Sequence, residues 1–187
     1  MDTILVNQLP VRTWNRLGVN ATALPWDQAA SRELEQTHIA AKAGGQETVR
    51  LSVQGEGEYS EKSVVVDAAE GSSVTVYEDL RSRQHLLVRT QMKVGPGAKV
   101  RLVQLLGTEQ DAVLRNEVSG TCQQEGSVEL LQVLLGRGDV YTDSRFTLKG
   151  DGSALTADMG YLGQARQVLD MNLVVDHYGK KTASRID

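Results

Sequence analysis

The chain has 187 residues and a formal net charge of −4, and 40% of its residues are hydrophobic although only 4% are aromatic. This length suffices for one main domain, whose core must be filled by Val, Leu, Ile and Ala, a composition that suits stacked β layers. Acidic and basic residues are mixed without a basic block, so we expect no nucleic-acid partner. No run is apolar enough for a signal peptide or a membrane span, so we expect a cytoplasmic protein with no membrane partner.

The N-terminal segment, positions 1–26, contains both tryptophans, Trp14 and Trp26, and shows no sustained periodicity. We interpret this segment as an N-terminal arm that packs Trp14 and Leu17 against the main body of the protein.

A change of composition follows the arm. Residues 27–43 are rich in Ala, Glu, Gln, Arg and Leu, with Leu34 and Ile39 as candidate inward positions, and the pair Gly44 and Gly45 follows them. This pattern predicts a helix that ends at the glycines. We therefore expect residues 1–45 to form an arm and a helix that precede the main domain.

Short runs rich in Val and Leu make up the rest of the chain, residues 46–187, and glycines separate them. Such runs are typical of strands. The runs before the middle of the chain cover residues 48–53, 63–67, 74–77, 85–94 and 99–106. Glycines at similar corners, Gly71, Gly97, Gly126 and Gly152, recur at intervals of roughly 26 to 29 positions, in the range expected of a solenoid.

Three all-β architectures fit short strands of this kind. A hairpin meander favours tight Asn-Gly or Asp-Gly loops, and only Asp151-Gly152 provides one. An immunoglobulin-like sandwich favours a buried Trp in mid-domain, whereas both tryptophans lie near the N-terminus. A parallel β-helix explains both the small aliphatic residues and the repeated glycine corners, so we expect residues 46–187 to form a β-helix core.

The search for chemically active residues gives few candidates. His38, His85 and His177 lie far apart in the sequence, without the spacing of metal-ligand pairs, and the common nucleophile and phosphate-binding motifs do not occur. Cys122 lies beside a glycine corner, where it is either a reactive or ligating thiol or a small residue at a turn. We favour the turn residue, because a metal site needs several ligands and there is no second cysteine.

Two carboxylates near the C-terminal end raise an enzymatic alternative. Asp170 and Asp176 flank an apolar run, and Arg185 follows it. Paired carboxylates perform acid–base chemistry in some β-helix enzymes that act on acidic sugars. The competing interpretation is that the basic residues here, including Lys180 and Lys181, are simply solvated.

The stretch from Gly160 to Asp187 resembles the SufB/SufD family of scaffold proteins in the SUF system of iron–sulfur cluster assembly. A Gly-Tyr-Leu segment at residues 160–162 and a Gly-Ala corner before the strand in residues 95–107 are similar to that family, and residues 7–20 look like the start of its SufD-like members. The matching motif residues, which we expect to be structural, are Gln167, Asp170, His177, Thr182 and Ser184.

This resemblance implies a right-handed parallel β-helix and a non-catalytic scaffold that acts with a SufC-type ATPase and a SufB-like subunit. It also implies an iron–sulfur cluster in the full complex, with no cofactor in this chain. Family members continue into further turns and a helical region that binds SufC, so we expect the chain to be truncated at Asp187. The family's Cys and His cluster ligands then have no counterpart here, and neither Cys122 nor His177 inherits their role.

Our main hypothesis from the sequence is therefore a scaffold subunit of this family. The presence of a single cysteine favours a SufD-like member. The alternatives are a β-helical carbohydrate-active enzyme and a self-assembling structural β-solenoid. An uncapped last turn exposes apolar residues and unpaired strand edges, so we also expect a homo-oligomer.

Overall fold

The computed structural model describes residues 2–9, 21–27, 29–164 and 166–187. This part of the chain forms strands and no helix, and so holds no helical segment with the length and hydrophobicity of a membrane span. The strands are β1 (Asp2–Val6), β2 (Thr22–Trp26), β3 (Arg32–Glu33), β4 (Thr37–Ala41), β5 (Gln46–Gln54), β6 (Tyr59–Ala68), β7 (Ser73–Ser82), β8 (His85–Val94), β9 (Lys99–Thr108), β10 (Val113–Cys122), β11 (Ser127–Gly136), β12 (Asp139–Leu148), β13 (Ala154–Leu162), β14 (Leu169–His177) and β15 (Ala183–Ile186).

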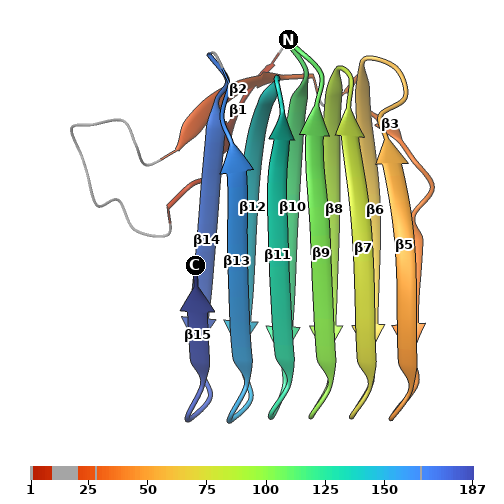
Figure 1. The fold of residues 1–187 in the computed structure, drawn as a ribbon, viewed down its shortest axis with the longest axis vertical. Coiled ribbons are helices and arrows are strands. Elements are labelled where there is room, and N and C mark those ends of the chain that lie inside the picture. The colour runs from red at the N-terminus through yellow and green to blue at the C-terminus, as the bar shows by residue number, and fades with distance from the viewer. Residues whose placement is uncertain (1, 10–20, 28, 165) are drawn as a thin grey trace.

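Two parallel sheets lie face to face (Figure 1). The front sheet has the order β15-β13-β11-β9-β7-β5, and the back sheet has the order β14-β12-β10-β8-β6-β3, with β4 also paired to β6. Successive strands alternate between the sheets, and paired residues are separated by the interval of the glycine repeat, as in Ser73↔Lys99 and Ala154↔Ala183. The prediction of an all-β parallel β-helix is therefore confirmed.

The turns at one end of the solenoid explain the glycine repeat. Ala98 N–H donates to the Gly95 carbonyl, and Gly97 has a φ of 63°, which is the pattern of a type II turn. The N–H of Gly97 donates to the carbonyl of Gln124 in the next turn. The equivalent positions with positive φ are Gly44, Gly71, Gly97, Glu125, Gly152 and Lys181. Gly126, which the sequence suggested as a corner glycine, is therefore one residue late.

The helix predicted over residues 27–43 is wrong. In its place β3 and β4 pair with β6, and the register puts Ile39 beside Val66 and Ala41 beside Ala68. Ile39 and Ala41 are 4% and 7% exposed. Burial of these alternate side chains in the solenoid outweighs the small helix propensity of the surrounding Ala, Glu and Gln residues.

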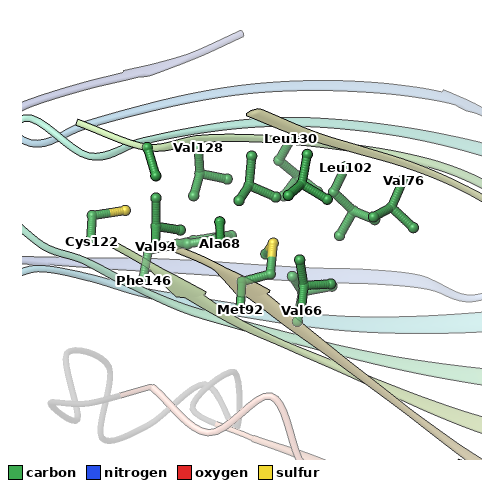
Figure 2. Packing of buried hydrophobic residues seen from close by; sticks show 14 of the residues in the cluster. Val66, Ala68, Val76, Met92, Val94, Leu102, Cys122, Val128, Leu130 and Phe146 are labelled. Atoms are coloured by element: carbon green, nitrogen blue, oxygen red, sulfur yellow. The ribbon is translucent and has the colours of Figure 1, made fainter. Parts of the chain in front are cut away.

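The interior contains two apolar clusters with polar side chains between them. Figure 2 shows the larger cluster, in which Met92, Val94 and Phe146 of the back sheet meet Leu102 and Leu130 of the front sheet. The smaller cluster lies toward the opposite end of the strands and includes Leu80, Leu86 and Leu134. Stacked aliphatic side chains of this kind provide most of the favourable burial.

The antiparallel β1–β2 hairpin lies outside the solenoid, near the top of Figure 1. Its Val6, Leu24 and Trp26 are buried against Leu87 and Tyr141, which point outward from the back sheet. The predicted burial of Trp14 and Leu17 concerns positions outside the described residues, whereas Trp26 is 1% exposed.

Candidate functional site

The five residues that resemble the family motif fall into two groups in the structure. Gln167 lies just before β14 and Asp170 at its start, whereas His177, Thr182 and Ser184 lie where β14 turns into β15. Extended strand separates Asp170 from His177, which places the two residues about 23 Å apart. The motif therefore does not form one site.

Asp170 and Gln167 hold neighbouring parts of the chain together. Thr22 Oγ1 donates to Asp170 Oδ2 at 2.5 Å, and Asn7 Nδ2 donates to the Asp170 carbonyl at 3.1 Å, so Asp170 attaches the hairpin to β14. Gln167 Nε2 donates to the Gly138 carbonyl at 2.6 Å, which fixes the segment before β14 against the preceding turn. These contacts are structural in kind.

His177 joins the two sides of the last turn. Its Nδ1 lies 2.8 Å from Thr182 Oγ1 and its Nε2 lies 3.2 Å from Ser184 Oγ. Both ring nitrogens thus have a hydroxyl partner, and the His-Thr-Ser part of the motif is a set of hydrogen bonds across the β14–β15 turn.

Cys122 lies in the core and not at an exposed corner. It is the last residue of β10, its side chain is 0% exposed, and the register places it between Val94 and Leu148 (Figure 2). Burial raises the pKa of this thiol to about 11. A thiol in this state is protonated at neutral pH and packs as a small hydrophobe.

The other residues considered from the sequence also remain apart. His38 contacts Asp67 at 2.6 Å on the outer surface, whereas His85 stacks on Tyr59. Within the ranges that the structure describes, no group of three or more His, Cys, Asp or Glu side chains could hold a metal ion. The described side chains therefore do not fit the ligand set of an iron–sulfur cluster.

The carboxylates of the carbohydrate-enzyme alternative do not form a pair. Asp170 and Asp176 lie near opposite ends of one strand, about 20 Å apart, and Arg185 pairs with Asp187. Acid–base catalysis needs both groups within reach of one substrate. This geometry removes the support for that alternative.

A ladder of charged residues on the outer face of the back sheet is the most organised polar surface. Arg89 bridges Glu61 at 2.7 Å and Glu117 at 3.0 Å, and Arg115 contacts Glu117 at 2.6 Å. Farther along, Arg145 Nη2 lies 3.0 Å from Asp143 Oδ2. Three arginines thus pair with three carboxylates on the adjacent strands β6, β8, β10 and β12.

The hairpin closes one side of this ladder and forms a cleft. Arg115 lies over the Trp26 ring at 4.9 Å, and burial lowers its pKa, an effect that Glu117 partly offsets. Arg145 Nη2 also donates to the Gln8 carbonyl at 3.0 Å. The cleft has a volume of about 420 Å³ and is lined mainly by Asn7, Gln8, Leu9, Arg115, Glu117, Tyr141, Asp143 and Arg145.

The charges in this ladder are balanced, with three arginines paired to three carboxylates. The sequence analysis did not identify this charged ladder. Arg89 nevertheless pairs in register with Glu117, and Glu117 with Asp143, at the same interval as the glycine repeat. Superimposing the chain on that repeat would have placed these residues side by side.

A comparison with protein-family models found a matching family. The model described as "SUF system FeS cluster assembly, SufBD core domain" matches residues 50–187, which span the solenoid from β5 to β15. Comparisons with curated proteins and with solved structures found no match. Because the match covers most of the chain and coincides with the stacked strands, the chain belongs to the SufBD core-domain family of SUF iron–sulfur cluster assembly.

Proposed function

We propose that this chain is a SufD-like scaffold subunit that acts in the cytoplasm with a SufC-type ATPase and a SufB-like subunit. The observation that carries the proposal is the family match over residues 50–187. The SufD-like assignment is supported by Cys122, the single cysteine, which is buried and has a raised pKa.

In this proposal the iron–sulfur cluster is cargo, and the subunit contributes a rigid frame and no reacting group. The described side chains provide no metal-ligand set, so the ligands come from elsewhere in the complex. We propose a right-handed solenoid, because parallel crossover connections nearly always have that hand. We also propose residues 46–187 as the core and residues 1–45 as an N-terminal part that includes the hairpin.

Co-purification tests this proposal. The tagged chain is co-expressed with the SufC-type ATPase and the SufB-like subunit of the same source, and both are expected to remain bound. The visible absorbance of an assembled cluster should be the same for the wild type and for Cys122→Ala, because the buried thiol takes no part.

Circular dichroism of the Cys122→Ala variant checks that it is folded, and Cys122→Val provides a second variant that keeps the apolar volume. Loss of cluster absorbance in both folded variants would show that Cys122 is a ligand. Retention of neither partner would contradict the assignment to this complex.

A further inference from the structure

The outer face of the front sheet carries a block of apolar side chains. Outward positions of β9, β11 and β13 form this block, which we call the front patch, and Leu135 and Leu162 within it are 43% and 57% exposed. The front patch consists of Val103, Leu105, Leu131, Val133, Leu135 and Leu162. The register places Val103 beside Leu131, Leu105 beside Val133, and Leu135 beside Leu162, so the block is continuous.

On the back sheet, outward apolar residues are covered by another segment of the chain. Leu87 and Tyr141 point away from the solenoid, yet they are 0% and 6% exposed because the β1–β2 hairpin covers them. In Figure 1 no described segment lies over the front sheet. Contiguous apolar surface that a protein leaves open in this way marks a contact with another molecule.

Charges around the front patch are separated by sign. The outward positions of β5, β7 and β9 carry Arg50, Arg81, Lys99 and Arg101, with Asp79 as the single carboxylate. The outward positions of β11 and β13 carry Glu129 and Asp158 and no cation. The half formed by β5, β7 and β9 therefore has a net positive charge. The half formed by β11, β13 and β15 carries the carboxylates Glu129 and Asp158 together with Arg185, which pairs with Asp187.

We propose that the front patch is the interface of a face-to-face dimer of this chain. A two-fold axis that is parallel to the strands and lies between β9 and β11 places β9 of one copy over β11 of the other. Arg101 then faces Glu129 of the second copy, because the two residues are in register within each sheet. By the same relation Val103 faces Leu131, and Leu105 faces Val133.

A second copy fits this face because its charges are complementary, with Arg101 of each copy opposite Glu129 of the other. An isologous contact brings β9 of each copy onto β11 of the other, so the same charge match forms twice. The five front-sheet strands of nine or ten residues, β5 to β13, give at the usual spacing a face of roughly 700 Å², close to the area of about 800 Å² that each partner contributes to a standard interface. This inference is independent of the proposed role in cluster assembly.

Two matched variants test the surface by analytical ultracentrifugation over a range of concentrations. The wild-type chain is expected to dimerise, and Val133→Lys should abolish the dimer because the symmetric contact buries two unpaired ammonium groups. Val65→Lys is the control, since Val65 is a partly exposed outward valine of the back sheet, and it should leave the dimer intact. A monomeric wild type, or a dimer that survives Val133→Lys, would overturn the proposal.

A charge exchange tests the register. Arg101→Glu and Glu129→Arg should each weaken self-association, because each variant places like charges opposite one another. An equal mixture of the two variants should form a heterodimer, because the carboxylate introduced in one chain then faces the guanidinium introduced in the other. Arg101 and Glu129 of one chain also contact each other at 3.5 Å, but mixing does not alter that contact. Failure of the mixture to associate would exclude the proposed axis.

Discussion

Glu78 illustrates how a single residue can couple this fold to pH. Its side chain lies inside the solenoid, where Thr90 Oγ1 and Gln104 Nε2 donate to its carboxyl oxygens at 3.1 and 2.6 Å. The residue is 2% exposed, and burial raises its pKa although both hydrogen bonds act in the opposite direction. The folded protein therefore holds a proton on Glu78 at pH values where the unfolded chain has lost it.

Glu78→Gln should change how stability depends on pH. Because the folded pKa is raised, the contribution of Glu78 to stability is greatest below its unfolded pKa of about 4.3 and is lost as the pH rises through the folded value. The isosteric amide does not titrate, so the variant should gain stability relative to the wild type as the pH rises above that unfolded value. Urea unfolding measures this difference, and Glu70→Gln at an exposed corner is the control. A difference that does not vary with pH would show that Glu78 keeps its ordinary pKa in the fold.

Of all the elements, the stacked type II turns were predicted most directly from the sequence, through the repeat of corner glycines. Four of the six turn positions with positive φ are glycines, and a glycine is the residue that such a position favours. Glu125 and Lys181 occupy the other two, so a search for glycine alone places the corner at Glu125 one residue late. Their presence shows that the ladder of hydrogen bonds between turns can hold a strained residue.

Gly97→Ala should destabilise the fold by about 1 kcal/mol, because a side chain disfavours the φ of 63°. A Cβ added at Gly97 meets no atom within 4 Å, so this loss reports backbone conformation and not a clash. Glu125→Gly is the matched opposite change and should be neutral or stabilising. Thermal unfolding of the pair tests the argument, and a neutral Gly97→Ala together with a destabilising Glu125→Gly would contradict it.

Elements outside the repeat were harder to predict for a physical reason. The segment over residues 27–43 has the composition of a helix, but β6 presents an unpaired edge and an apolar interior that β4 completes. The burial of Ile39 depends on this long-range pairing, which local composition does not reveal. The position of the β1–β2 hairpin was equally hard to predict, because its partners Leu87 and Tyr141 are distant in sequence.

At the scale of the whole molecule, the repeat predicts the architecture but not the surfaces. The interval between corner glycines determines which strands stack, so the solenoid and its family could be recognised from the chain. The charged ladder and the front patch depend in addition on which face each residue occupies, and a shift of one residue would turn Arg89 or Val133 inward. Candidate sites on a solenoid therefore become visible only once the register is known.

The stacked arrangement also predicts how the solenoid responds to a core substitution in one of its central strands. Leu102 is 0% exposed and lies in register between Val76 and Leu130, so Leu102→Ala leaves a cavity between three strands of the front sheet and should lower stability by about 2–5 kcal/mol. Each turn contacts only its neighbours, so faster amide exchange should be greatest in β7, β9 and β11 and should decline toward β15.

Hydrogen exchange followed by mass spectrometry measures this gradient, with Lys99→Ala as an exposed control on the same strand. If exchange rises equally in every strand, the solenoid opens as a single cooperative unit. A graded response would instead show that stability is passed from turn to turn, as expected where the long-range contacts of one strand are mostly with the strands directly above and below it in the same sheet.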